Sequence, residues 1–125
     1  ALAADTHKFE ARYLDRLVGR WPEDEAVYRE RSPIHHVDRL STPLLLLQGS
    51  EDAVVPPAQA HAMADALRDR GVPFALIEFP DEGHGFRKAA NVVRAVEAEL
   101  AFFADRFGFE PADDLPPLTV EGGGA

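Results

Sequence analysis

The chain has 125 residues, the size of one domain or part of one, and 46% of them are hydrophobic, which is enough for a core. Its formal net charge of −9 disfavours a nucleic-acid partner and an anionic membrane surface. Cysteine is absent, which excludes disulfides and thiolate metal sites. We expect a cytoplasmic protein, because the first residues lack the features of a signal peptide and no apolar run approaches the roughly 20 residues of a membrane span.

The first third of the chain predicts short helices. Thr6 is suited to the N-cap of a first helix, which we expect to end at Gly19. Three apolar side chains of this helix recur every four residues and share one face: Phe9, Tyr13 and Leu17. A second, short helix is predicted near residues 23–31, and Pro33 favours an extended segment over residues 32–34.

The middle of the chain predicts a βαβ unit. Residues 44–47 are four leucines between proline and glycine, which is typical of a strand buried on both faces in a parallel sheet. A helix follows from Pro57 to about Arg70, with Gly71 suited to its C′ position. Its apolar stripe consists of Ala60, Met63, Ala64 and Leu67. Residues 74–79 form the next strand, and we expect a right-handed crossover.

A last helix is predicted over residues 89–106. Its apolar residues alternate steps of three and four, which is the period of one buried helical face. They are Val93, Val96, Leu100, Phe103 and Phe107. From Glu110 onward this pattern ends, and residues 110–125 combine prolines, glycines and four acidic residues with no basic one. We expect this segment to be a flexible, loosely attached acidic tail.

Two residues that can carry chemistry follow the two predicted strands. Asp52 lies just after the first strand and His84 just after the second. Because the carboxyl ends of parallel strands meet at one rim of a sheet, we expect both side chains there. A carboxylate that holds an imidazole by its Nδ1–H leaves Nε2 free as a general base. Gly83 and Gly85 flank the histidine and permit close approach of a substrate.

Each of these residues also has a simpler interpretation. Asp52 could cap the turn or the helix that follows it, and His84 could be a surface loop histidine. Their joint placement, with the aspartate before the histidine, is the chain order of α/β-hydrolases and favours catalysis.

Four stretches resemble the C-terminal end of the prolyl oligopeptidase family, in its acylaminoacyl-peptidase and dipeptidyl-peptidase branch. They are Phe9–Asp15, Tyr28–Val37, Gln48–Pro56 and Glu82–Phe86, and they contain the patterns Gly-x-x-Asp-x-Val-Val-Pro and Glu-Gly-His-Gly-Phe. The resemblance covers residues 1–109. It implies the C-terminal portion of an α/β-hydrolase fold, with parallel strands and flanking helices.

The same resemblance implies a function. Asp52 would be the triad aspartate and His84 the triad histidine of a serine peptidase that cleaves short peptides through an acyl-serine intermediate. The family uses no metal or organic cofactor. In its full-length members a β-propeller precedes the hydrolase domain and screens access to the site.

The nucleophile of such a triad is missing from the pattern. The family's serine lies in a Gly-x-Ser-x-Gly turn between a strand and a helix, and that motif does not occur here. The serines are Ser32, Ser41 and Ser50. Ser50 is close to Asp52 in sequence, but it belongs to the loop of the acid. We therefore expect the serine upstream in a longer enzyme, and this segment alone to be inactive.

A leucine strand without its neighbours exposes an edge and an apolar face. We therefore expect a homodimer or a higher homo-oligomer. Two other functions remain open: an esterase-type α/β-hydrolase, and a non-catalytic module that only oligomerises.

The remaining candidates are weaker. Adjacent His35 and His36 point in different directions in most backbones, and no third ligand stands at metal-binding spacing. Trp21, Tyr28 and Phe86 could line a substrate pocket, although aromatic residues more often pack in a core. Phe86 is the best candidate of the three because it follows the histidine directly.

Overall fold

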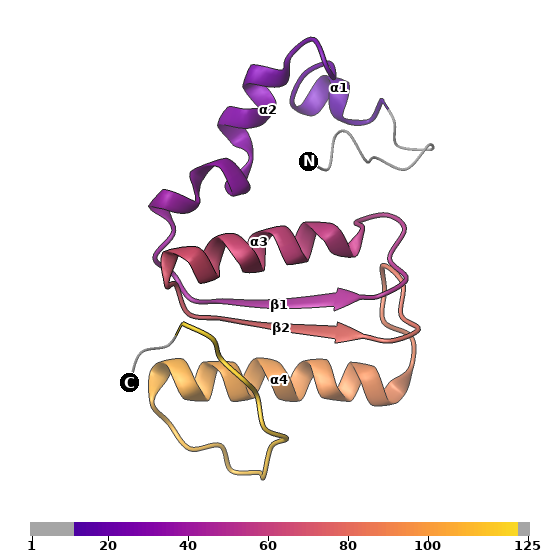
Figure 1. Cartoon of the computed structure of the whole chain (residues 1–125). Coiled ribbons are helices and arrows are strands. Elements are labelled where there is room, and N and C mark those ends of the chain that lie inside the picture. The colour runs from indigo at the N-terminus through magenta and orange to yellow at the C-terminus, as the bar shows by residue number, and fades with distance from the viewer. Residues whose placement is uncertain (1–11, 123–125) are drawn as a thin grey trace.

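The computed structural model of the chain describes residues 12–122. Its elements, in chain order, are α1 (Leu14–Leu17), α2 (Glu25–Arg31), the 3₁₀ helix η3 (Pro33–Arg39), β1 (Leu44–Gly49), α3 (Pro57–Arg70), β2 (Phe74–Phe79) and α4 (Ala89–Phe107). Figure 1 shows α3 on one face of the two strands and α4 on the other, with α1 and α2 beyond α3. None of the helices in this described part is long and apolar enough to cross a membrane.

The two strands are parallel and directly paired. Their register runs from Leu44 opposite Phe74 to Gly49 opposite Phe79, so both strands end at the same rim. The predicted βαβ unit is confirmed, and β1 extends two residues beyond the four leucines. Gly71 ends α3 in the left-handed conformation with φ of 69°, which glycine adopts without strain.

The core lies between α3 and the sheet. Its buried members are Ala64, Leu67, Val72 and Phe74. Partly buried residues pack against them, namely Leu40, Leu44, Leu46, Met63 and Leu76. Three of the four residues predicted for the stripe of α3 therefore face this core, namely Met63, Ala64 and Leu67, and Leu67 is 0% exposed.

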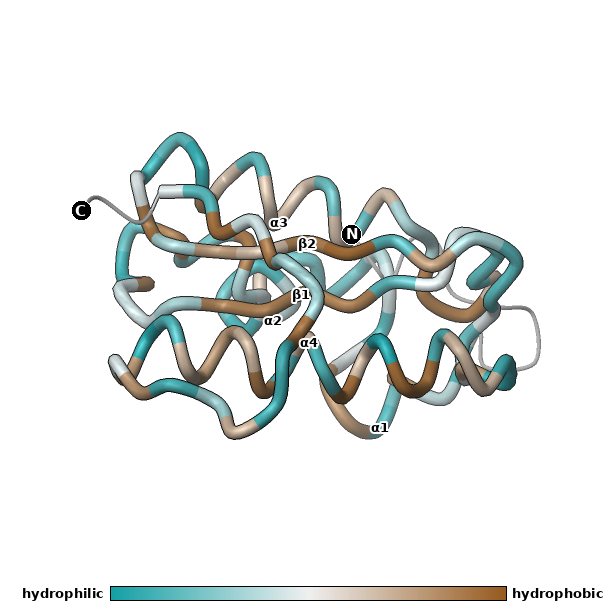
Figure 2. Tube along the Cα trace, turned by 90° about the horizontal axis from the view of Figure 1, so that it is seen from below, coloured by the Kyte–Doolittle hydropathy of each residue, from teal (hydrophilic) through white to brown (hydrophobic). Residues whose placement is uncertain are grey.

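The apolar face predicted for α4 is not buried, and this prediction is wrong for the described residues. Its members are 39–76% exposed: Leu100 39%, Phe103 50%, Val93 55%, Val96 60% and Phe107 76%. The buried residues of α4 are instead Ala95, Ala98, Phe102 and Ala104. The reason is geometric, because a helix buries only the face that meets a partner, and the small alanines allow this helix to lie along the sheet. Figure 2, which views the molecule from the α4 side, shows hydrophobic segments along α4 and both strands.

The leucine strand is also less buried than predicted. Residues 44–47 are all half-buried. In the described part of the chain, β1 pairs with β2 alone, so its other edge has no strand beside it. Helices α3 and α4 lie on the two faces of the pair, but full burial of a parallel strand also requires strands on both sides, and within the described residues β1 has a neighbour on one side alone.

The N-terminal predictions hold only in part. Thr6 and Phe9 lie outside the described residues, and α1 begins at Leu14. Tyr13 and Leu17 are 68% and 57% exposed, so they do not form a buried face. Ser32 is extended as predicted, but Pro33 begins η3 rather than continuing the extended segment, because proline at the first position starts a helical turn well.

The C-terminal segment returns to the start of the strands, as the yellow trace in Figure 1 shows. Glu121 and Phe74 exchange two backbone hydrogen bonds, of 2.7 and 2.9 Å, in an antiparallel bridge. The Arg68 guanidinium binds the Glu121 carboxylate at 2.8 Å. The segment expected to be loosely attached therefore has a defined contact at Glu121, while the boundary at residue 109 stays a prediction.

Candidate active site

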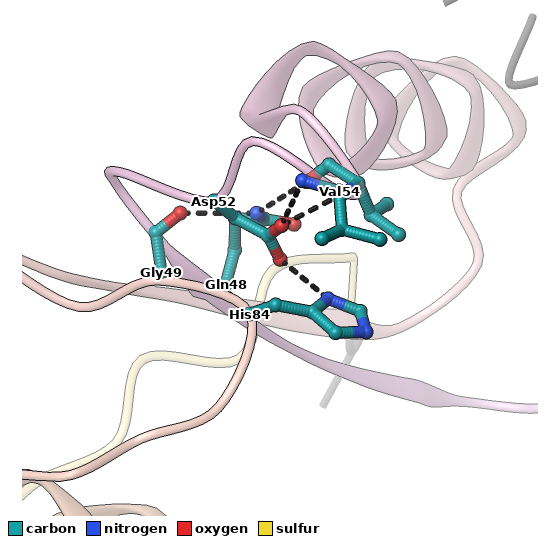
Figure 3. Close-up of polar contacts among 6 residues, drawn as sticks. Gln48, Gly49, Asp52, Val54 and His84 are labelled. Carbon is teal, nitrogen blue, oxygen red and sulfur yellow. Dashed lines mark hydrogen bonds and ion pairs between the residues drawn. The ribbon is translucent and has the colours of Figure 1, made fainter. Parts of the chain in front are cut away.

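Asp52 is held in the loop that follows β1. Its Oδ1 accepts hydrogen bonds from the backbone N–H groups of Val54 at 2.9 Å and Val55 at 2.8 Å. Its Oδ2 lies 3.1 Å from Nδ1 of His84 (Figure 3). The side chain is only 8% exposed, so both carboxylate oxygens are fixed by the protein.

His84 lies in the loop that follows β2 and is 58% exposed. A carboxylate can only accept, so the contact with Asp52 assigns the ring proton to Nδ1. In the neutral ring Nε2 is then the nitrogen without a proton, on the far side of the ring from Asp52. The structure thus brings together the two site residues that the sequence predicts, and the geometry suits an imidazole that takes a proton at Nε2.

The environment of Asp52 favours its charged form. Burial by itself would raise the pKa of the carboxyl, but the hydrogen bonds from Val55, His84 and Val54 outweigh it, and the pKa lies below its ordinary value. Asp52 is therefore an ionised acceptor for the His84 ring at neutral pH.

Two loops pack directly on each other at Gly49: the loop after β1 that carries Asp52, called here the acid loop, and the loop after β2 that carries His84, called here the histidine loop. A Cβ atom built on Gly49 would lie 2.3 Å from the carbonyl oxygen of Gly83 and 2.4 Å from that of Glu82. The backbone N–H of Glu51 donates to the Glu82 carbonyl at 2.9 Å. The Gln48 side chain closes the acid loop by donating to the carbonyls of Gly49 and Val55. Figure 3 shows how Gln48 and Gly49 lie beside the Asp52–His84 pair.

Glu82 is a buried carboxylate two residues before His84, with 2% of its surface exposed. It accepts hydrogen bonds from the backbone N–H groups of Arg87 and Lys88 and from the side chain of Asn91. The bond from Asn91 and the bond from Lys88 lower its pKa most, against the effect of burial. The sequence places Glu82 in a motif, but its burial and its three hydrogen bonds were not predicted, because residue spacing does not distinguish a buried carboxylate from an exposed one.

A hollow of about 500 Å³ adjoins the imidazole. Apolar side chains make up most of its lining, including Leu47, Val55, Phe86, Val92 and Val96. Phe86 packs on Phe79 with ring centroids 4.6 Å apart. The hollow therefore lies on the α4 side of the sheet, where the exposed apolar residues of that helix begin.

The other predicted candidates lie apart from this pair. Trp21 and Tyr28 pack edge to face with centroids 5.5 Å apart, and the Tyr28 hydroxyl donates to the Gly19 carbonyl. His36 contacts the carbonyl of Glu30. Over residues 12–122 no group of three or more potential metal-ligating side chains gathers.

Ser50 does not complete the site. It is exposed, and its backbone N–H donates to the carbonyl of Phe79. Within the described part of the chain, no serine hydroxyl is hydrogen-bonded to His84. Within the described residues, Asp52 and His84 therefore contact each other without a serine hydroxyl bonded to the imidazole.

Solved structures similar to this chain include a peptidase. A puromycin-hydrolyzing peptidase of Mycobacterium tuberculosis superposes over 96% of this chain and 18% of its own, with a TM-score of 0.89 and 49% sequence identity. Agreement of this extent at this identity means that the strand pair and its helices have the same fold as the corresponding part of that peptidase.

Curated relatives include both peptidases and esterases. Dipeptidyl peptidase family member 6 of Caenorhabditis elegans is 36% identical over 81 residues, which cover 62% of this chain and 11% of the relative. Esterase LipQ of Mycobacterium tuberculosis is 32% identical over 100 residues, which cover 78% of this chain and 24% of the relative. The chain thus spans about a quarter or less of the length of these proteins.

The sequence profile of the Prolyl oligopeptidase family matches residues 1–110, which is most of the chain. With the parallel strand pair, the flanking helices and the structural agreement described above, this match leads to one conclusion. The chain belongs to the prolyl oligopeptidase family, and its fold is part of that family's α/β-hydrolase domain.

Proposed function

We propose that Asp52 and His84 are the acid and the base of a Ser-His-Asp triad in a serine peptidase that hydrolyses short peptides. The observation that carries the proposal is the 3.1 Å contact between His84 Nδ1 and Asp52 Oδ2. The two backbone N–H groups on Asp52 Oδ1 support it further, because they fix the orientation in which the carboxylate meets the ring.

In this proposal His84 Nε2 takes the proton from the serine hydroxyl while the serine oxygen attacks the peptide carbonyl. Asp52 stabilises the imidazolium that forms and keeps the ring in the Nδ1–H tautomer. His84 then gives the proton to the leaving amine, and an acyl-serine remains. Water, deprotonated by the same nitrogen, attacks the acyl carbonyl. The bond to the serine oxygen then breaks, this oxygen takes the proton back from His84, and the carboxylic acid product leaves.

The serine is proposed to lie upstream in a longer protein that contains these 125 residues. The exposed position of Ser50 in the acid loop supports this interpretation. A fluorophosphonate probe tests it on the purified chain, with His84→Ala beside it. We expect no labelling of the chain alone, whereas labelling that depends on His84 would assign the nucleophile to a serine within it.

The triad is tested in the protein that carries the chain together with its upstream part. His84→Ala and Asp52→Asn should each lower kcat for an aminoacyl p-nitroanilide by about 10³-fold or more. Asp81→Asn is the matched control, because it removes a neighbouring carboxylate that is 70% exposed. Full activity in His84→Ala would overturn the proposal.

Puromycin is a natural choice of second substrate, because the solved relative hydrolyses it and the bond that joins its amino acid to the nucleoside is an amide. We expect its hydrolysis to show the same dependence on His84 and Asp52.

An esterase is the second candidate, favoured by the alignment with esterase LipQ over 78% of this chain. The two activities share the triad, so the acyl group must be held constant in the test. An ester and an anilide of the same amino acid distinguish them: a peptidase cleaves both, and an esterase cleaves the ester alone.

Self-association is proposed as well. The apolar residues of α4 that are 39–76% exposed support it, because monomeric proteins rarely expose large contiguous apolar patches. If the chain forms a stable oligomer and the Asp52 and His84 variants change no activity, a non-catalytic module that oligomerises becomes the better account.

A further inference from the structure

We propose that Glu82 is a positioning residue for His84: its side chain joins the two ends of the loop that carries the imidazole, and its backbone fixes that loop to the acid loop. This inference rests on the proposed function, in which His84 is the base. The described hydrogen bonds of the Glu82 carboxylate go to Arg87, Lys88 and Asn91 and not to the imidazole. Glu82 does not line the apolar hollow beside Phe86, although it lines, together with His84, a second hollow of about 440 Å³. Its proposed role is therefore to hold the ring of His84 against Asp52.

The side chain of Glu82 closes segment 83–86 into a ring. Its Oε2 accepts from the backbone N–H of Arg87 at 2.7 Å, and its Oε1 from that of Lys88 at 2.9 Å. Asn91, in the first turn of α4, donates to Oε1 at 3.0 Å. The residue before the segment is thus bonded to the residues after it and to the helix that follows.

Segment 83–86 needs such an external constraint. Gly83 and Gly85 flank the histidine, and a Cβ atom built on Gly85 would meet nothing within 4 Å. The imidazole itself is 58% exposed. Two glycines around an exposed side chain leave the backbone many conformations, so the direction of the imidazole is set by what holds the two ends of the segment.

The backbone of Glu82 provides the second constraint. Its carbonyl accepts the N–H of Glu51 at 2.9 Å, one residue before Asp52. The same carbonyl lies against Gly49, where no side chain would fit. Glu82 therefore links the histidine loop, the acid loop and the start of α4.

A carboxylate suits this position better than an amide. Burying a charge is costly unless it is fully hydrogen-bonded, and here three donors converge on it. It also lies beside the N-terminal end of a 19-residue helix, where the helix dipole favours negative charge. In Glu82→Gln the volume is kept, but an amide NH₂ would face an N–H donor and at least one hydrogen bond would be lost.

The test compares Glu82→Gln with the wild type in the protein that carries the chain and its upstream part. We expect kcat to fall about 10-fold or more while KM changes less than about 3-fold, because a misdirected base slows chemistry without altering substrate contacts. Asp81→Asn is the matched control on the adjacent residue, because it removes an exposed ion pair with Lys88 that spans the same segment at 3.2 Å. Exposed ion pairs contribute little, so this variant should stay within about 2-fold of the wild type in both constants. Where His84→Ala is inactive, a folded Glu82→Gln protein with the kcat of the wild type overturns the inference.

Asn91→Ala keeps the test decisive if Glu82→Gln does not fold. It leaves the carboxylate in place and removes one of its three donors, so we expect a kcat between those of the wild type and Glu82→Gln. An unchanged kcat in a folded Asn91→Ala protein would then count against the inference.

A measurement that does not need turnover separates this inference from the proposed function. The ¹⁵N shifts of the His84 ring report which nitrogen carries the proton. We expect the Nδ1–H tautomer in the wild type and in Asp81→Asn, and a mixture of tautomers in Glu82→Gln and Asn91→Ala. If His84→Ala retains activity but the tautomers shift as expected, the proposed function fails and the positioning role stands. If His84→Ala is inactive and the tautomers do not shift, the proposed function stands and the positioning role of Glu82 fails.

Discussion

The two helices that flank the sheet each carry an apolar stripe, yet within the described residues the stripe of α3 is largely buried and that of α4 is exposed. On the α3 side, Leu67 and Phe74 are 0% and 1% exposed. On the α4 side, Val96 and Phe107 are 60% and 76% exposed. Periodicity therefore identifies a face that needs a partner, but it does not say whether the partner is in the same segment of chain.

The two residues of the proposed catalytic pair also differ in burial. Asp52 is 8% exposed and its oxygens are bonded to the acid loop and to His84, whereas His84 is 58% exposed and lines the hollow on the α4 side. Both carboxylate oxygens of Asp52 are thus hydrogen-bonded within the described residues. The His84 ring is oriented by Asp52 but faces the exposed α4 side of the sheet, called here the open side, where the proposed nucleophile and substrate would have to enter.

The largest effect that tests this comparison is expected from two chemically identical substitutions, one on each side. Leu67→Ala empties the closed core and should lower the free energy of unfolding by about 2–5 kcal/mol. Leu100 is 39% exposed on α4, so Leu100→Ala should cost less than about 1 kcal/mol. Urea unfolding of the purified chain at low concentration measures both. Equal costs would mean that the α4 face is buried in solution and that the comparison is wrong.

A second prediction concerns the rim where the two loops meet. Gly49→Ala places a methyl group against the carbonyls of Glu82 and Gly83, and backbone cannot move aside as a flexible side chain can. We expect a loss of about 1–3 kcal/mol and a weaker contact between His84 and Asp52. Gly85→Ala is the control, since its Cβ would meet nothing within 4 Å, and it should leave stability within about 1 kcal/mol of the wild type. A neutral Gly49→Ala would show that the loops separate without cost.

The third prediction uses pH to test how firmly the closed side holds Asp52. Its pKa is lower in the folded chain than its ordinary value of about 4, so its contribution to stability is fully present above that pH and is lost as pH falls through the folded pKa. Asp52→Asn should cost about 1–2 kcal/mol near pH 5, and the difference from the wild type should shrink below about pH 4. Unfolding curves between pH 2.5 and 5 measure this difference. A difference that stays constant over that range contradicts the lowered pKa.

Local patterns were enough to predict much of this fold and the placement of its site. Residues 74–79 form a strand as expected, Gly71 ends α3, and Asp52 and His84 meet because parallel neighbours end at one rim. These features depend on short stretches of chain or on a rule of sheet topology.

Features that depend on tertiary contact were not predictable. The spacing of α4 did not reveal that Ala95 and Ala98 would face inward, because several faces of that helix are apolar. The need for glycine at position 49 arises from a carbonyl more than 30 residues away in sequence, and the burial of Glu82 depends on the start of α4. Half-burial of the leucine strand likewise depends on which neighbours are present.

The smallest effect on the folded chain, and the most specific one for the open side, is expected at the end of α4. Phe103 and Phe107 are 50% and 76% exposed, and their rings lie 6.1 Å apart. Replacing both with serine should change the stability of a single chain by less than about 1 kcal/mol. It should, however, lower the apparent mass in light scattering toward that of one chain, because it removes apolar area that self-association would bury.

The matched control removes apolar side chains from the opposite side of the molecule. Tyr13 and Leu17 are 68% and 57% exposed near α1, which Figure 1 shows beyond α3 and away from α4. Their double replacement with serine should leave the apparent mass unchanged. If both double variants lower it equally, association follows total apolar exposure and not the α4 face. If neither does and the wild type is already a single chain, the α4 side is stable without a second copy and the proposal of self-association is wrong.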